Sequence, residues 1–539
     1  MIQPQHRSMA WSALGGYVLA LLAGALVLIY LHAYQAGFSG ADEPAHFLNG
    51  VFVSNYLRHH AGTNPMAFAV EYYLHYPKIS IGHWPPAYYG LLGVLLLALP
   101  ATPQAAFLIN LLISALPAAA LGWALAWLAG RRIALAGCAV YALTPLAVES
   151  QAFFMLDQAL TACCAAAAIA WLAYTRRPGW ARAGLFAALC AGAVLVKGNG
   201  WLLVLMPLFH MLLTRGWRLL ALPHLYCAGL AAAAVVVPWY WLTASIAADG
   251  FNYQAGLPYA WKALAANLYT LLRNLGYAGA PLALFAVVVE YRQRLAAPQR
   301  WAVVSLAISL ILATLALQSL VPADIDDRYL APALPGYTLL AALGVAHVGA
   351  AIRGSPGRAA SILLMLAMLA PGVAHLAQRG AKVDMRAADL PVPESPSVWI
   401  IDGSSGAEGA LIAVLAVRDP GLRHYAVRAS KLLAVSDFMG RRYALKYADE
   451  RQVLEELRRL GARYVVLVRL DNAAAFPHSE QLSAALQLPE SPFRRVMTLP
   501  HRYRAGVTEV YQADAEADIG AVRGLGMPVK GGALTRSAR

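Results

Sequence analysis

Long apolar runs separated by short polar segments dominate the chain as far as about residue 380. Because a membrane-spanning helix needs roughly 20 mostly apolar residues, the pattern predicts a polytopic helical membrane protein with about eleven spans, in a range of about 10–13. The predicted spans are residues 11–34, 105–129, 133–150, 158–174, 182–197, 199–213, 219–245, 265–290, 300–321, 329–350 and 359–378.

One further apolar segment, residues 86–100, has only fifteen residues. This is below the roughly 17–25 residues that a spanning helix needs, so we expect an interfacial or re-entrant helix. Residues 35–104 then form one large external loop between the first two spans.

Arginine distribution supports this topology, because loops rich in Lys and Arg remain on the cytoplasmic side. The arginines of alternate loops are Arg131, Arg132, Arg176, Arg177, Arg182, Arg215, Arg218, Arg292, Arg294, Arg300, Arg353 and Arg358. The net charge of +14 therefore reflects topology and anionic lipid rather than a nucleic-acid partner. An odd number of spans places the segment after residue 380 outside.

After residue 380 the pattern changes to short β-rich runs that alternate with amphipathic helices. The runs are 397–402, 461–468 and 507–511, and the clearest amphipathic helix is 450–460. This alternation predicts a soluble extracytoplasmic α/β domain over residues 380–518. The Gly- and Arg-rich residues 519–539 are expected to be a disordered tail.

Composition agrees with the membrane assignment, since 60% of the residues are hydrophobic and only 13% are charged. Against that background, Asp42 and Glu43 are conspicuous directly after the first span. Two adjacent carboxylates at a membrane surface are costly to desolvate, which favours a site that handles a proton, a metal or a hydroxyl group. Ordinary solvation at the membrane surface is the alternative.

Other polar residues lie on the same predicted face of the membrane. Asp157 is either a second functional carboxylate or a helix N-cap. The basic and aromatic candidates are Lys78, His83, Lys197, Arg328 and Tyr329. Their simpler interpretations are an aromatic-belt residue for His83, a snorkelling side chain for Lys197 and a solvated loop, with an aspartate partner, for Arg328.

Five short motifs occur in a characteristic order: residues 41–46 (ADEPAH), 83–89 (HWPPAYY), 155–157 (MLD), 196–198 (VKG) and 327–332 (DRYLAP). Together they resemble the GT-C glycosyltransferases, in particular the protein mannosyltransferase and aminoarabinose transferase branch of glycosyltransferase families 39 and 83. The resemblance covers about residues 10–350.

The resemblance implies a membrane glycosyltransferase that moves a sugar from a polyprenyl-phosphate donor to an acceptor on the periplasmic face of a bacterial inner membrane. Residues 1–378 would form the catalytic module, without a cofactor. Asp42 would activate the acceptor, supported by Glu43, and Asp157 would be the second acidic residue. The donor phosphate would be bound by Arg328, Tyr329, Lys197, Lys78 and His83. The acceptor could be a protein, lipid A or a cell-envelope glycan.

The chain departs from the family pattern at Trp84, where many relatives have a basic residue before the first proline. His83 or Lys78 would then take over the contact with the phosphate.

Two other functions remain open. A transporter or flippase of lipid-linked sugars would place polar groups near the bilayer midplane, whereas the carboxylates here follow the spans. A metal-dependent oligosaccharyltransferase would use Asp42, Asp157 and a histidine around a divalent cation, although no clear ligand spacing occurs.

The topology is testable with single cysteines introduced at Ala61 and Arg132 in a cysteine-free background. We expect a membrane-impermeant thiol reagent to label only the first from outside intact cells, because the two positions lie on opposite faces. Labelling of both cysteines from the same side would show that residues 86–100 cross the membrane.

Overall fold

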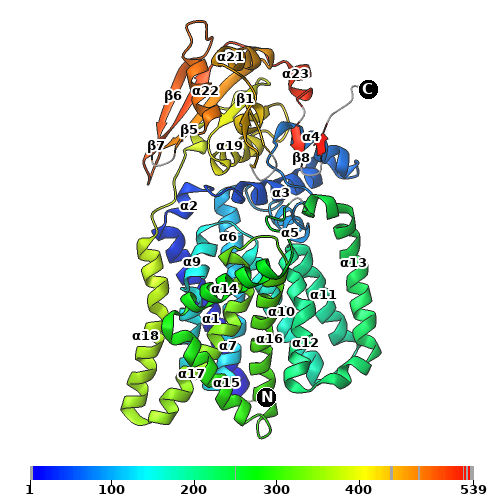
Figure 1. Cartoon of the computed structure of the whole chain (residues 1–539), viewed down its shortest axis with the longest axis vertical. Coiled ribbons are helices and arrows are strands. Elements are labelled where there is room, and N and C mark those ends of the chain that lie inside the picture. Colours follow the sequence, from blue (N-terminus) through cyan, green and yellow to red (C-terminus); the bar gives the residue numbers. More distant parts are fainter. Residues whose placement is uncertain are drawn as a thin grey trace.

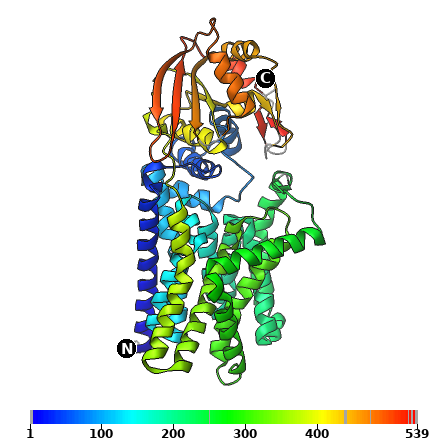
Figure 2. The same cartoon turned by 60° about the vertical axis from the view of Figure 1, so that its left-hand side comes forward.

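A computed structural model describes residues 4–248, 250–436, 441–471, 474–525, 527–529 and 532–534. A bundle of long helices forms one end of the molecule, and a mixed α/β layer lies on the other end (Figure 1). Short helices from the loop after α1 lie between the two layers in both views (Figure 2).

Seven helical stretches in these described residues are long and apolar enough to cross a membrane. They are α1 (Pro4–Tyr30), α6 (Pro103–Ser114) with α7 (Leu116–Ala129), α10 (Asp157–Arg176), α13 (Pro223–Ala248), α16 (Pro298–Leu320), the 3₁₀ helix η4 (Asp327–Ala333) with α17 (Leu334–Ile352), and α18 (Gly354–Gln378). Two shorter apolar helices, α11 (Trp180–Val196) and α12 (Leu202–Thr214), accompany them, with the 3₁₀ turns η2 (Gly198–Trp201) and η3 (Trp217–Ala221) beside α12.

Two predicted spans are broken rather than continuous. The segment 133–150 becomes α8 (Arg131–Ala142) and α9 (Pro145–Ala152), which meet at 56°. Thr144 caps α9, because its hydroxyl accepts a hydrogen bond from the amide of Ala147 and a proline follows at the first helical position. Counting each bent pair once and both shorter helices, the described helices supply the eleven spans that the sequence predicts.

The second break separates α14 (Leu257–Asn274) from α15 (Gly276–Arg292), which meet at 98°. Gly276 lies at the break with a φ of 64°, a conformation that glycine adopts without strain. As a result, α14 lies across the end of the bundle beneath the α/β layer (Figure 1). This orientation brings its last residues towards the loop that carries Asp42.

The segment 35–104 forms short helices at that same end of the bundle. They are α2 (Ala33–Ala36), α3 (Glu43–Asn55), the π-helical turn η1 (Tyr56–His60), α4 (Pro65–His75) and α5 (Ala87–Leu95). With nine residues, α5 is too short to cross a bilayer, as the sequence predicts.

The C-terminal region contains a five-stranded sheet in the order β2-β1-β5-β7-β6. Strands β2 (Tyr425–Arg428), β1 (Val398–Asp402) and β5 (Ala462–Leu470) are parallel, and β7 (Gly506–Gln512) and β6 (Arg494–Pro500) continue antiparallel. The helices of this region are η5 (Ala387–Asp389), α19 (Ser405–Arg418), α20 (Ala429–Leu432), α21 (Glu450–Arg459) and α22 (Pro477–Leu486), and β3 (Ala434–Val435) pairs with β4 (Ala444–Leu445).

The tail that we expect to be disordered is partly folded. Residues Ile519–Arg523 form helix α23, because Asp518 caps its first turn and Val522 is buried. Arg523 forms an ion pair with Glu71 of α4 at 2.5 Å. Strands β8 (Met527–Val529) and β9 (Gly532–Leu534) pair antiparallel, and residues 526, 530–531 and 535–539 lie outside the described residues.

Helix α19 joins the two layers by packing its backbone on the loop before α3. A Cβ atom at Gly406 would lie 2.1 Å from the carbonyl oxygen of Ser39, and one at Gly409 would lie 2.7 Å from Cε of Lys78. One continuous apolar core includes Trp399 and Leu411 of the sheet layer together with residues of the bundle. The α/β layer is therefore packed against the loop that carries Asp42 and Glu43.

A Gly406→Ala substitution tests this packing. Since the new methyl group has no room beside a backbone carbonyl, we expect a loss of stability of about 1–3 kcal/mol and faster proteolysis of the segment that joins α18 to β1. Thermal unfolding and limited proteolysis in detergent measure both effects. Gly421→Ala is the matched control, because the nearest atom to its new Cβ lies 4.0 Å away; equal behaviour of the two variants would contradict the close packing.

Candidate functional site

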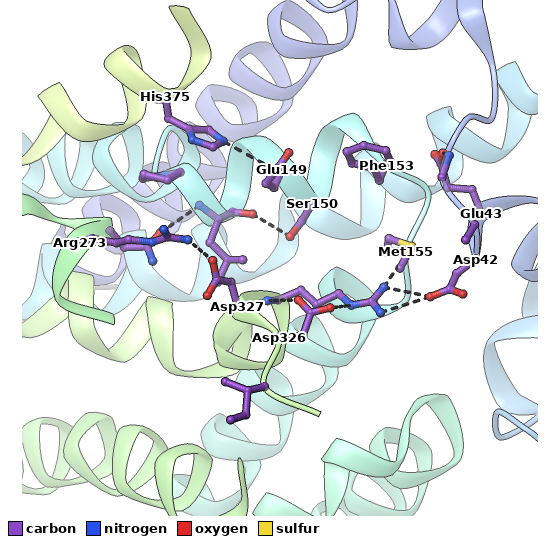
Figure 3. A pocket seen from close by; sticks show the side chains of 17 residues that line it. Asp42, Glu43, Glu149, Ser150, Phe153, Met155, Arg273, Asp326, Asp327 and His375 are labelled. Carbon is purple, nitrogen blue, oxygen red and sulfur yellow. Dashed lines mark hydrogen bonds and ion pairs between the residues drawn. The ribbon is translucent and has the colours of Figure 1, made fainter. Parts of the chain in front are cut away.

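Asp42 stands at the first turn of α3 and faces Arg328 of η4. The Nη1 and Nη2 atoms of Arg328 donate to Oδ2 of Asp42 at 3.3 and 3.2 Å (Figure 3). The Asp42 side chain is half-buried, and its carboxylate does not cap its own helix. This carboxylate is therefore available to a cavity as well as to the guanidinium.

Arg328 is shared between two carboxylates. Its Nε atom lies 2.8 Å from Oδ2 of Asp326, and Oδ1 of Asp326 accepts a hydrogen bond from the Arg328 amide at 3.1 Å. Nη1 also approaches the sulfur of Met155 at 3.7 Å. The planar guanidinium is thus held in one orientation, with its two terminal nitrogens directed towards Asp42.

Asp157 and Lys197 form a buried ion pair beside this arrangement. Asp157 opens α10, and its Oδ1 accepts from Nζ of Lys197, which follows α11, at 2.6 Å. The ammonium of Lys197 also lies 4.6 Å from the ring centre of Tyr329. Two cations therefore lie near the ring of Tyr329, Lys197 at 4.6 Å and Arg328 at 5.6 Å from its centre, and each pairs with a carboxylate.

Glu43 is adjacent to Asp42 in sequence but has different surroundings. Its carboxylate is fully buried and accepts hydrogen bonds from the amides of Ser39, Gly40 and Phe154 at 2.7–2.9 Å. Nζ of Lys382 bridges both of its oxygens at 2.7 and 3.0 Å. With these partners, Glu43 holds the chain that presents Asp42.

Lys78 and His83 are the other two residues that the sequence assigns to the donor phosphate. Nζ of Lys78 donates to the carbonyl and the hydroxyl of Ser405 in α19, at 3.0 and 3.1 Å. Burial, followed by repulsion from Arg428, lowers the pKa of Lys78 to about 7. His83 is half-buried, with its ring centre 4.4 Å from that of Trp84.

Two residues without a predicted role, His46 and Lys382, adjoin these groups. His46 lies four residues after Asp42, on the same face of α3, and its Nδ1 is 2.8 Å from the hydroxyl of Tyr89. Burial lowers the pKa of His46 to about 3, so its ring is neutral at physiological pH. The i, i+4 spacing from Asp42 could have indicated that His46 lies near that carboxylate. Nothing in the sequence indicates that Lys382 contacts Glu43.

The charge state of Asp42 follows from its neighbours. Burial raises its pKa, but the positive charge of Arg328 and its hydrogen bonds to the carboxylate outweigh this effect, so that the pKa lies below its ordinary value. Asp42 is therefore ionised at neutral pH and can accept a hydrogen bond from a hydroxyl group.

A cavity of about 570 Å³ opens beside Asp42 (Figure 3). It is lined by Gly40, Ala41, Asp42, Glu43, Pro145, Leu146, Glu149, Ser150, Phe153, Met155, Arg273, Asn274, Ile325, Asp326, Asp327, Arg328 and His375. Arg273 and Asp327, which both line the cavity, form an ion pair. Glu149 pairs with Arg379, which is not one of the lining residues. Among the described residues, no group of three His, Cys, Asp or Glu side chains could hold a metal ion.

Comparisons with known proteins relate this architecture to membrane glycosyltransferases. Residues 84–241 match the family described as dolichyl-phosphate-mannose-protein mannosyltransferase. The whole chain is similar to the crystal structure of ArnT from Cupriavidus metallidurans in the apo state, with a TM-score of 0.54, 14% identity, and coverage of 92% of this chain and 98% of that one. No curated protein sequence matches the chain significantly.

Two further structures are similar. ArnT from the same bacterium bound to undecaprenyl phosphate has a TM-score of 0.49 and 14% identity, and the match covers 91% of this chain and 97% of that one. The arabinofuranosyltransferase AftD from mycobacteria has a TM-score of 0.48 and 15% identity, and the match covers 92% of this chain and 40% of that one.

The chain is thus a polytopic membrane protein with a GT-C fold. Within that class, residues 84–241 are similar to the protein mannosyltransferase family, and the fold of the chain is similar to that of apo ArnT.

The buried pair of Glu43 and Lys382 is testable by a double-mutant cycle. Lys382→Met leaves a carboxylate buried without its cation, so we expect a loss of stability of about 3–5 kcal/mol, and the double variant with Glu43→Gln should recover part of it. Unfolding in detergent by heat or SDS measures these changes. Arg386→Met, which removes a more exposed ion pair with Asp389, is the control; a Lys382→Met effect as small as the control's would contradict the role of the pair.

Proposed function

We propose that this protein is a membrane glycosyltransferase that transfers a sugar from a polyprenyl-phosphate donor to an acceptor. The contact between Asp42 and Arg328 at the edge of the cavity supports this proposal most directly. It places an ionised carboxylate, suited to a hydroxyl group, beside a guanidinium, suited to a phosphate. The family description names a dolichyl-phosphate sugar, which is a donor of the same chemical class.

The proposed reaction is a single displacement. An acceptor hydroxyl donates a hydrogen bond to Asp42, and its oxygen attacks the anomeric carbon of the donor sugar. The bond between that carbon and the phosphate oxygen breaks, polyprenyl phosphate leaves, and the hydroxyl proton passes to Asp42 and then to solvent. Because the pKa of Asp42 is low, proton transfer accompanies bond formation rather than preceding it.

Arg328 and Lys197 stabilise the charge that develops on the departing phosphate. Asp157 orients Lys197 through their ion pair at 2.6 Å, and the ring of Tyr329, which lies near both cations, borders the proposed phosphate position. In this proposal, Lys78 and Glu43 act through position: Lys78 bonds to α19, and Glu43 fixes the loop that carries Asp42. The reaction uses the chain's own cations and no metal ion.

We place the reaction on the periplasmic face of a bacterial inner membrane. The arginine-rich connections, such as those between α10 and α11, α15 and α16, and α17 and α18, lie at the end of the bundle opposite the sheet (Figure 1). The positive-inside rule assigns that end to the cytoplasm. The α/β layer and the cavity then face the periplasm, where a protein, lipid A or a cell-envelope glycan is the candidate acceptor.

An Asp42→Asn variant tests the proposal. We expect its kcat to fall by about 10²–10⁴-fold, because the amide cannot take the acceptor proton, while binding of polyprenyl phosphate persists. Transfer from radiolabelled polyprenyl-phosphate sugars in detergent measures the rate, and a separate binding assay measures the lipid. Asp389→Asn is the control, since Asp389 pairs with Arg386 away from the cavity. Near-normal transfer by Asp42→Asn would eliminate the proposed role.

A further inference from the structure

We infer that the cavity beside Asp42 binds the acceptor as an uncharged, polyhydroxylated sugar and discriminates against a phosphorylated acceptor. This inference rests on the proposed function, because it takes Asp42 as the group that meets the acceptor hydroxyl. Asp42 lines the cavity together with Arg328, whereas Lys197 and Tyr329, the other two residues that we assign to the donor phosphate, do not. The cavity is therefore on the acceptor side of the ion pair between Asp42 and Arg328.

The charges around the cavity do not cancel. Five carboxylates line it, from Asp42, Glu43, Glu149, Asp326 and Asp327. Glu43, Glu149 and Asp327 each have their own cation, namely Lys382, Arg379 and Arg273. Asp42 and Asp326 share the single guanidinium of Arg328, which leaves one negative charge in excess. Histidine is mostly uncharged at neutral pH, so His375 does not alter the balance.

A second phosphate group, beyond the donor phosphate that we assign to Arg328, would find no uncommitted cation in the described lining. Both arginines in the described lining, Arg273 and Arg328, already pair with carboxylates. An anion placed against the excess carboxylate meets like-charge repulsion, which disfavours its binding. The same arrangement of side chains suits neutral hydroxyl groups. The carboxylates can accept hydrogen bonds from the hydroxyl groups, and the guanidinium groups can donate hydrogen bonds to the hydroxyl oxygens.

Size and shape also favour a sugar. About 570 Å³ lies within the range of small-molecule sites, which is roughly 300–1,000 Å³. Polar groups occur at both ends of the cavity, at Asp42 and at Glu149, and Phe153 and Met155 lie between them (Figure 3). A sugar ring with several hydroxyl groups can form hydrogen bonds with both Asp42 and Glu149. The single hydroxyl group of a serine side chain would leave most polar groups of the lining without a hydrogen bond to the acceptor.

The test uses a panel of decyl hexosides, each compared as an acceptor with its own 6-phosphate. With labelled polyprenyl-phosphate sugars as donors, we expect kcat/KM to favour the neutral hexosides by about ten-fold or more. Equal or better use of the 6-phosphates, or transfer to a serine-containing peptide in place of the hexosides, would overturn the inference.

Direct binding of the same acceptors, measured without a donor, separates this inference from the proposed function. If no donor yields product or free polyprenyl phosphate, the proposed function fails. In that event, tighter binding of the neutral hexoside still supports the assignment of the cavity, and tighter or equal binding of the 6-phosphate contradicts it.

An Asp326→Asn variant tests the origin of the preference. The asparagine oxygen can still accept from the Arg328 amide, but the excess charge disappears, so we expect the preference for neutral over phosphorylated hexosides to fall several-fold. Asp324→Asn is the matched control, because Asp324 is two residues away and does not line the cavity. An unchanged preference in Asp326→Asn would show that the excess charge does not select the acceptor.

Discussion

Removing the charge of Glu43 from water is the constraint on which the end of the bundle around Asp42 depends. A buried carboxylate is tolerated only with a cation and hydrogen-bond donors around it. Lys382 and the amides of Ser39, Gly40 and Phe154 meet that requirement from three separate segments of the chain. These segments are therefore held at one point, and Asp42 is the next residue along the chain.

The α/β layer extends this arrangement. Its helix α19 approaches the same loop closely at Gly406. Ser405 of this helix accepts hydrogen bonds from the ammonium group of Lys78. The loop before α3 thus has the bundle on one side and α19 on the other. Such two-sided support is what a catalytic carboxylate needs if its position is to be kept without a metal ion.

Much of this arrangement could be predicted because charges are conspicuous in a hydrophobic chain. Asp42, Asp157, Lys197 and Arg328 stand out for that reason, and the structure brings them together around Tyr329. The different surroundings of Asp42 and Glu43 could not be predicted, since they depend on Lys382, more than 300 residues away in sequence. The hydrogen bonds of Lys78 to Ser405 of α19 could not be predicted either, because the position of that helix relative to the bundle is not encoded locally in the sequence. The bends at Thr144 and Gly276 could not be predicted either. Hydropathy indicates how long an apolar segment is, but not whether its helix changes direction within that segment.

Because of the ion pair between Glu43 and Lys382, the boundary between bundle and sheet layer differs according to whether it is defined by fold or by electrostatics. By fold, the bundle ends with α18 at Gln378 and the sheet begins at Val398. By electrostatics, the boundary lies later, because Lys382 belongs to the connecting segment yet neutralises a charge inside the bundle's loop. A chain cut directly after α18 would lose the counterion along with the sheet, whereas one cut a few residues further on would keep it. The connecting segment is therefore part of the electrostatic core of the bundle, although it has almost no regular secondary structure of its own.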